Sequence, residues 1–345
     1  MNITVDTDPG RLAAHVPRPR VPVLRSPFPS RLNRYTAEGE ERALRWARRI
    51  GLITAEEAIG LSRQRFGHLA GRCHPDLGRL ALVDTCRWYL WFAVVDDRYC
   101  DRPEQGADPA WLAHRLAVLS RVLDDPGTET EDAIGAAAAD LVRRTRPRAT
   151  HEQYRRLVLG FQAMFFGLLW ELAAGRPDSG LTAPDYLRMR LNTGGLPAFV
   201  TLTEIFSGRP PNPQEVARPE VGALITRLGN LIMWQNDVRS YPREMASTRP
   251  ALSLPTVLEQ DRGLAPQDAL DLAARMWHAE FRQYHAARDT VLALGAATPG
   301  LRRYADRLHD LLAGFLTWHY ETARYGEVPT GPPPPVVRRR SRPAH

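Results

Sequence analysis

Three carboxylates at the end of an apolar run are the first candidates for chemistry. Asp96, Asp97 and Asp101 follow eight consecutive apolar or aromatic residues, 88–95. On a helix, Asp97 and Asp101 lie one turn apart, with Asp96 about 100° around the axis. In an interior, two carboxylates about 4 Å apart would repel by roughly 4 kcal/mol. The pattern therefore indicates either a divalent cation, with Mg²⁺ favoured by the oxygen-only ligands, or a solvated acidic helix end.

A second set of oxygen-bearing side chains follows the apolar segment 231–235. Asn236, Ser240 and Glu244 recur every four residues, and each step turns a helix by about 40°, so the three form one stripe. An amide oxygen, a hydroxyl and a carboxylate are credible Mg²⁺ ligands. Pro242 lies inside this stripe, and proline removes a helical hydrogen bond. If the helix ended at Ser240, Glu244 would leave the stripe and only a polar helix face would remain.

The elements that must position these residues read as helices. Apolar positions recur at helical spacing, and no alternating β pattern of useful length or internal repeat is found. Helix starts of the capping-box type occur at Thr36 and at Thr54, which precedes Glu57 by three residues. We expect helices over 36–50, 54–67, 79–96, 108–123, 130–145, 150–174, 183–192, 197–206, 214–240, 265–295 and 299–325. The prediction is an all-α bundle in a single domain of residues 35–326.

Charge is concentrated at the two ends of the chain. Residues 1–34 carry six Arg against Asp6 and Asp8, a net charge of +4, and residues 327–345 carry four Arg against Glu327, a net charge of +3. Because the whole chain has a net charge of +7, the body between them carries none. Both ends are also rich in proline and are expected to be flexible tails. A neutral body argues against nucleic-acid binding.

Composition also bears on the compartment. The three cysteines, Cys73, Cys86 and Cys100, have no paired spacing, which favours reduced thiols and a cytoplasmic location. The chain starts without a basic and apolar signal-peptide pattern. No apolar stretch is expected to reach the roughly 18 residues that a membrane span needs. A homodimer is left open.

Together, the two oxygen-bearing segments resemble a known family. DDRYCD (96–101) and NDVRSYPRE (236–244) resemble the DDxxxD and NDxxSxxxE motifs of bacterial class I terpene synthases, in the same order and 140 residues apart. The resemblance implies metal ligation by Asn236, Ser240 and Glu244, and mainly by Asp96 in the first motif. It implies that Asp97 and Asp101 act through hydrogen bonds to arginines. The family accommodates a proline near its second motif.

The same resemblance implies diphosphate-binding residues. Arg190 lies 46 residues before Asn236, where the family has its diphosphate sensor; Arg188 is the rival for this role. Thr193 would be the linker and Gly194 the effector at a helix break, which Gly195 and Pro197 also favour. The remaining diphosphate donors implied by the resemblance are Arg243 and the pair Arg324 and Tyr325.

The function implied by the resemblance is that of a terpene cyclase. Three Mg²⁺ ions and the arginines would stabilise departing pyrophosphate, and the carbocation would cyclise inside a deep apolar cavity lined by aromatic rings. Farnesyl diphosphate is the expected substrate, with geranyl and geranylgeranyl diphosphate as alternatives. The expected pocket residues are Tyr89, Phe92, Phe165, Phe166, Phe199 and Trp318.

Two rival functions are weighed against this one. A chain-elongating prenyltransferase of the same helical fold would carry a second aspartate-rich motif where this chain has Asn236 to Ser240. A helical interaction protein that uses its basic ends would be expected to lack some of the metal ligands or arginines, and all of them are present. The chain has no P-loop, Rossmann or HExxH motif and no DxDD sequence.

Overall fold

The helices fill the part of the chain that the structure describes. This computed structural model describes residues 19–24, 28–101, 108–175, 180–208, 211–245, 252–294 and 298–325. Within these ranges every regular element is helical, which confirms the predicted all-α class. The elements are α1 Thr36–Arg49, α2 Ala55–Gln64, α3 Phe66–Cys73, α4 Arg79–Val95, η1 Asp96–Asp101, α5 Pro109–Asp124, α6 Ala133–Thr145, η2 Arg146–Arg148, α7 His151–Ala174, α8 Ala183–Thr193, α9 Leu196–Phe206, α10 Pro213–Val216, α11 Pro219–Met245, α12 Leu254–Arg262, α13 Pro266–Ala293, α14 Pro299–Glu321 and η3 Ala323–Tyr325.

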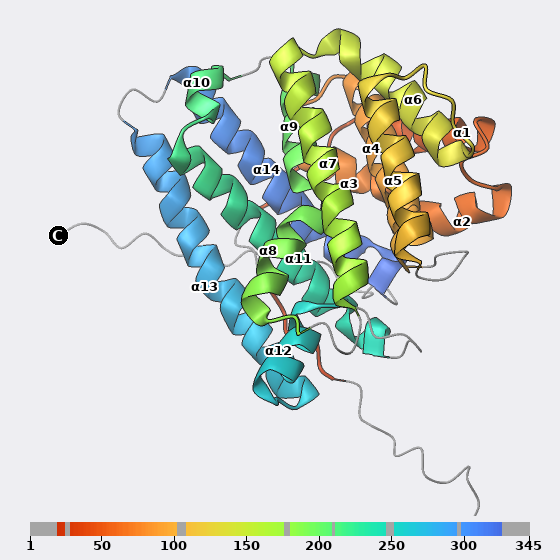
Figure 1. Ribbon diagram of the computed structural model, residues 1–345. Helices are drawn as coiled ribbons and strands as arrows, with labels where there is room; N and C mark the ends of the chain where they lie inside the picture. Colours follow the sequence, from red (N-terminus) through yellow and green to blue (C-terminus); the bar gives the residue numbers. More distant parts are fainter. Residues whose placement is uncertain are drawn as a thin grey trace, which may run out of the picture.

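Two groups of helices meet at α7 (Figure 1) and also through α3, which packs against α14. In one group α4 packs against α1, α3 and α6; in the other α11 packs against α8, α13 and α14. Helix α7 contacts α5 on the first side and α8 and α9 on the second. At the centre, Phe161 of α7 stacks on Trp88 of α4 with ring centroids 5.1 Å apart and meets Trp91 edge-on at 5.7 Å. Because stacked and edge-on aromatic contacts add to area burial, this cluster fixes α4 firmly against α7.

Two buried helices end in the oxygen-bearing motifs. Helix α4 continues beyond Val95 as a π-helical segment, η1, over Asp96–Asp101, a rare form that is frequent at functional sites. The α-helical geometry assumed for this motif is therefore replaced by a wider turn. Helix α11 runs without interruption through Pro242 to Met245, so Glu244 stays on the same helix as Asn236. The proline lies in the last turn, where few downstream residues depend on its missing hydrogen bond.

Part of the N-terminal segment packs on the helical body. Leu24 is 1% exposed, and its backbone N–H donates to the Tyr320 hydroxyl, which in turn donates to the Leu24 carbonyl. Phe28 packs edge-on against His309, and Arg31 pairs with Asp310 on α14. For residues 19–24 and 28–34 the expected flexibility is thus corrected, because an apolar side chain and an ion pair bind the segment to α14. Residues 1–18 and the predicted tail 327–345 lie outside the described residues.

Helix α7 is unusually apolar. By length and composition alone it could cross a membrane, with a mean hydropathy of 1.7 over its best window, half of which is buried inside the molecule. The expectation of no apolar stretch of that length is therefore wrong for α7. The helix nevertheless packs against α5, α8 and α9, and a core helix satisfies the same criterion. Leu159 and Phe166 lie on its exposed side.

Candidate active site

The segment after α14 joins the two motifs. Arg324 lies in η3 and extends its Nη2 to within 3.0 Å of Asp96 Oδ2 and 2.8 Å of Asp97 Oδ1. Its Nη1 donates to Gln64 Oε1 at 3.0 Å. Burial alone would lower the pKa of Arg324, but the carboxylates of Asp97 and Asp96 raise that pKa above its ordinary value. The first motif is therefore paired with a firmly charged guanidinium.

The other contacts of η3 go to the second motif. Asn236 Nδ2 donates to the Tyr325 hydroxyl at 2.5 Å, and Arg243 Nη1 donates to the Arg324 carbonyl at 3.1 Å. Two residues of η3 thus contact both motifs, Arg324 at Asp96 after the end of α4 and Tyr325 at Asn236 on α11. Two motifs that are 140 residues apart in the sequence therefore belong to one site.

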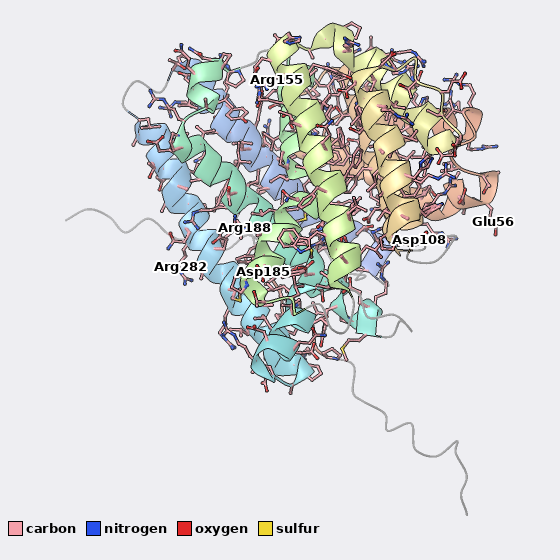
Figure 2. The ribbon with its side chains drawn as sticks, viewed as in Figure 1. Glu56, Asp108, Arg155, Asp185, Arg188 and Arg282 are labelled. Carbon is pink, nitrogen blue, oxygen red and sulfur yellow. The ribbon has the colours of Figure 1, made fainter. Side chains whose placement is uncertain are left out.

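Arg190 extends from α8 to the start of the second motif. Its Nη2 donates to Asn236 Oδ1 at 2.7 Å, its Nε donates to Asp237 Oδ1 at 3.0 Å, and its Nη1 donates to Thr193 Oγ1 at 3.1 Å. The rival Arg188 is exposed on the outer side of α8 (Figure 2). Of the two arginines, only Arg190 contacts the motif. Asp237 was not predicted as a site residue, although its acid type next to Asn236 was a visible signal.

The chain breaks between α8 and α9, next to Arg190. Gly194 ends α8, and a Cβ there would lie 2.1 Å from Met233 Sδ on α11. Gly195 has φ +63°, and a Cβ there would lie 2.9 Å from Met164 Sδ and 3.3 Å from a Phe92 ring atom. The predicted break at these glycines is confirmed. It allows α8 to approach α11 closely and opens a short non-helical stretch beside Phe92.

Ser240 and Glu244 complete the second motif one and two turns beyond Asn236. Ser240 is 3% exposed, and its hydroxyl donates to the Asp237 carbonyl at 3.4 Å. Glu244 Oε2 is buried and has no hydrogen-bond partner. Burial raises the pKa of Glu244 to about 7, against a lowering by Ser240. An unpartnered buried carboxylate oxygen is an atom that a bound cation would satisfy.

The donors fit Mg²⁺ better than a metal held entirely by protein. Among the described residues, no three His, Cys, Asp or Glu side chains lie together as a metal cluster. The first motif offers carboxylates, and the second offers an amide, a hydroxyl and a carboxylate oxygen. Mg²⁺ uses such oxygen donors when phosphate oxygens and water complete its coordination. The side chain of Asp101 lies outside the described residues, although its backbone belongs to η1.

Three of the six predicted pocket aromatics meet at α9, and a fourth lies beside Tyr325. Phe199 contacts Tyr89 and Phe92 on α4, with ring centroids 4.7 and 5.2 Å apart. Trp318 meets Tyr325 edge-on at 6.1 Å, and its indole donates to the Gln64 carbonyl. Phe92 and Phe199 lie next to Gly195, and Tyr89 contacts Phe199. Trp318 lies next to Tyr325.

Two of the three phenylalanines of α7, Phe165 and Phe166, were predicted to line the pocket. Phe165 is 4% exposed and faces Phe161 at 6.4 Å, so it belongs to the aromatic core. The prediction that Phe166 lines the pocket is wrong, because its side chain is 61% exposed. Successive side chains on a helix point about 100° apart. Because α7 buries Phe165, the next residue, Phe166, points toward its exposed side. Phe161 was not among the predicted aromatics, although its ring centroid lies 6.4 Å from that of Phe199.

An all-α domain with an aspartate-rich helix end, an Asn-Ser-Glu stripe and arginines between them has the architecture of a class I terpene synthase. Residues 87–283, more than half of the chain, match the family model described as terpene synthase family 2, C-terminal metal binding, and the chain belongs to this family. It is therefore an enzyme, a carbon–oxygen lyase acting on phosphates.

Individual relatives are distant but cover nearly the whole chain. A 4-epi-cubebol synthase of Streptosporangium roseum, named as farnesyl diphosphate cyclizing, is 26% identical over 90% of this chain and 93% of its own. A corvol ether synthase of Kitasatospora setae with the same substrate in its name is 28% identical over 89% and 96%. The crystal structure of an ancestral reconstruction, SVS_A2, has a TM-score of 0.80 at 25% identity, covering 87% of this chain and 90% of that one.

Proposed function

We propose that this terpene synthase binds farnesyl diphosphate, ionises it by loss of pyrophosphate, and cyclises the resulting carbocation to a sesquiterpene hydrocarbon or alcohol. The observation that carries the proposal is the η3 segment, in which Arg324 contacts Asp96 and Tyr325 contacts Asn236. These contacts bring cationic donors close to the oxygens that we propose as metal ligands, and such an arrangement would stabilise a departing diphosphate. The relatives named as farnesyl diphosphate cyclizing support the choice of substrate.

The proposed metal site lies between Asp96, Asp97 and Asp101 on one side and Asn236, Ser240 and Glu244 on the other. In the first motif, Asp96 is the main proposed ligand, and Asp97 and Asp101 act through arginines. Three Mg²⁺ ions bound there would neutralise the charge that develops on the leaving pyrophosphate. Arg190, Arg243, Arg324 and Tyr325 would donate hydrogen bonds to it. Thr193 holds Arg190 Nη1, so a movement of this arginine toward the diphosphate would be transmitted to Gly194 at the helix break.

The proposed role of the aromatic rings is to guide the cation. Tyr89, Phe92 and Phe199 form one cluster, and Trp318 lies beside Tyr325. A ring face stabilises a nearby positive charge by about 0.5–2 kcal/mol without acting as a nucleophile. The cation would therefore fold against these rings until it loses a proton or meets water.

The substrate is tested by incubating the enzyme with the C10, C15 and C20 diphosphates and Mg²⁺. Cyclic products extracted from the C15 reaction and identified by mass spectrometry are the expected result. Turnover confined to the C10 or C20 substrate would move the proposal to geranyl or geranylgeranyl diphosphate. No product from any of the three, together with no Mg²⁺–pyrophosphate binding by calorimetry, would favour a scaffold.

The site is tested by two substitutions and one matched control. Asp96→Asn and Asn236→Ala should each abolish product formation and leave the helical circular dichroism unchanged. The control is Asn230→Ala on the same helix, because Asn230 donates to Glu280 Oε1 at 2.8 Å and not to a proposed ligand. Activity that survives both site substitutions would refute the assignment.

A reducing compartment is proposed from the cysteines. Cys73 and Cys86 are free thiols buried in the core, and burial raises the pKa of both thiols above their ordinary value. Thiols held protonated are slow to oxidise, which fits the cytoplasmic location expected from their spacing. Thiol titration of the protein purified without reductant measures this, and three reactive thiols after unfolding are expected.

A further inference from the structure

Asp237 has all its acceptor capacity used inside the protein. Its Oδ1 is contacted by Arg190 Nε at 3.0 Å and by Arg190 Nη2 at 2.9 Å. Its Oδ2 accepts from the Tyr186 hydroxyl at 2.6 Å and from the Leu254 backbone N–H at 3.1 Å. The side chain is 1% exposed. A carboxylate offers about four lone-pair directions, so Asp237 has none left for a metal ion, unlike its neighbour Asn236.

These four contacts join Asp237 on α11 to two other helices. Tyr186 and Arg190 lie one turn apart on α8, and Leu254 is the first residue of α12. No side chain caps the N-terminus of α12 from within its own turn. The Asp237 carboxylate therefore supplies an acceptor and a negative charge to that helix start, as a capping residue would. One carboxylate of α11 thus fixes α8 and α12 relative to the second motif.

For Arg190 the carboxylate fixes both charge and orientation. Burial alone would lower the pKa of Arg190, but Asp237 and Tyr186 raise that pKa. Two adjacent guanidinium nitrogens facing one oxygen also define the plane of the group. Without Asp237, the Arg190 guanidinium would lose its paired carboxylate. Leaving a buried charge without its partner is strongly destabilising.

We propose that Asp237, oriented by Tyr186, is a positioning residue that holds Arg190 in place for the departing diphosphate and keeps α8, α11 and α12 in register around it. The inference rests on the proposed function, in which Arg190 binds diphosphate. It adds two residues that act through Arg190 and touch neither metal nor substrate.

The chain contains a matched control for this arrangement. Glu204 on α9 is also buried, pairs with Arg156 and accepts from the Tyr304 hydroxyl at 2.9 Å. This second carboxylate, arginine and tyrosine set has the same chemistry. Tyr304 lies 17 residues before Glu321, the last residue of α14, about 26 Å along the helix axis from the end that leads into η3. A purely structural contribution should look alike in both sets.

The experiment compares Asp237→Asn and Tyr186→Phe with Glu204→Gln and Tyr304→Phe. For Asp237→Asn we expect kcat to fall about 10- to 100-fold, as for other residues that orient a functional side chain. For Tyr186→Phe, which removes one of four contacts, a fall of about 3- to 10-fold is expected. The Glu204 and Tyr304 variants should lower the melting temperature similarly while kcat stays within about twofold of wild type. Equal effects on kcat in both sets would overturn the proposal.

A double-mutant cycle with Arg190→Lys distinguishes positioning of Arg190 from a general loss of stability. If Asp237 acts through Arg190, Asp237→Asn should add no further loss of kcat to Arg190→Lys, whereas independent effects would multiply. Binding of Mg²⁺–pyrophosphate by calorimetry should show the same pattern and gives a readout without turnover. A wild-type enzyme that binds pyrophosphate but converts no isoprenoid diphosphate contradicts the proposed substrate alone. The positioning role is contradicted if the effects of the two substitutions multiply in both readouts. It is also contradicted if the wild-type enzyme does not bind pyrophosphate.

Discussion

At the scale of single residues, the adjacent carboxylates of the first motif already have a cation. The repulsion expected between Asp96 and Asp97 is offset by Arg324, whose Nη2 lies within 3.0 Å of both. Sequence reasoning attributed that role to a metal ion, because an arginine 228 positions away cannot be placed from periodicity. Arg324 therefore offsets this repulsion without a bound ion. In the proposed function, it would share the carboxylates with Mg²⁺ once diphosphate binds.

Arg324→Lys tests whether the fork of the guanidinium is needed. Arg324 contacts two carboxylates with one nitrogen and Gln64 with another, and a lysine ammonium is a single point that cannot reproduce this geometry. We expect kcat/KM to fall about 100-fold with little loss of helical structure, since a charged hydrogen bond contributes roughly 1.5–3 kcal/mol. Steady-state kinetics with farnesyl diphosphate measure it.

The control for this change is Arg98→Lys. Arg98 lies in the same segment, η1, but pairs with the exposed Glu57, and surface pairs contribute little. Its kcat/KM should stay within about threefold of wild type. A similar loss in both variants would show that the segment is merely sensitive to substitution.

The residues of the site could be predicted to different extents. Spacing and resemblance favoured Arg190 over Arg188 as the diphosphate sensor, and in the structure Arg190 contacts Asn236 whereas Arg188 is exposed. Asp237 escaped prediction because the contacts that define its role come from Tyr186 and Leu254, whose positions depend on the packing of α8 and α12. Phe166 was misassigned because an apolar helix does not reveal from sequence which of two adjacent rings faces inward.

At the scale of elements, capping residues predicted the starts of helices better than the sequence predicted their ends. Thr54 forms the expected capping box with Glu57, and Thr150 forms another with Gln153. Thr36, in contrast, is the first residue of α1 and not its cap. The expected helix 54–67 ends at Gln64, because Arg65 adopts a left-handed φ of 57° before α3 begins. Nothing in an arginine's side chain signals that conformation, which the packing of α3 imposes.

Two helices near the second motif were also not resolved from sequence. The expected segment 214–240 is divided into α10 and α11, and α12 was not predicted at all. Helix α12 has nine residues with proline in its first turn, too short for a periodic pattern to stand out. Its start is fixed by a carboxylate on another helix, which is tertiary information.

Gly195→Ala tests the break between α8 and α9. With φ +63°, an alanine there pays the cost of a left-handed residue, roughly 1–2 kcal/mol, and its Cβ meets Met164 Sδ at 2.9 Å. We expect a lower free energy of unfolding and, because the neighbouring Phe92 must shift, at least a tenfold fall in kcat or a changed product mixture. Urea denaturation and product analysis measure the two effects.

Gly263→Ala is the matched control for the backbone cost. Gly263 ends α12 with the same φ of +63°, and a Cβ there meets nothing within 4 Å. Its variant should lose the same roughly 1–2 kcal/mol and keep the wild-type product mixture. If both glycine variants retain wild-type kcat and products, the close approach at Gly195 has no role in catalysis.

At the scale of the whole molecule, the fold class followed from periodicity but the meeting of distant segments did not. Trp88 and Phe161 pack face to face although they lie far apart in the chain. The segment 19–24, which composition placed in a flexible tail, packs on α14 through Leu24. Composition averages over a segment, whereas one buried leucine and its two backbone hydrogen bonds are enough to hold it.

Buried histidines should make the whole molecule sensitive to acid. Burial lowers the pKa of His74 and His319 to about 3 and that of His309 to about 4. Unfolded histidine titrates near a pKa of about 6.5, so below that pH the unfolded chain binds protons that the folded chain does not. The free energy of unfolding therefore falls as pH falls from about 6.5 toward 4, by about 2 kcal/mol per buried histidine at pH 5.

His309→Gln should reduce this acid sensitivity. The His309 ring packs edge-on against Phe28 at 4.2 Å, so the variant loses some stability at pH 7.5, but it has one proton fewer to take up on unfolding. Its melting temperature should consequently change less than that of wild type between pH 7.5 and 5. His114→Gln is the control, because the His114 side chain is 60% exposed and water reaches it in both states; its pH dependence should match wild type. Parallel curves for wild type and the His309 variant, recorded by calorimetry at several pH values, would show that acid unfolding is driven by other groups.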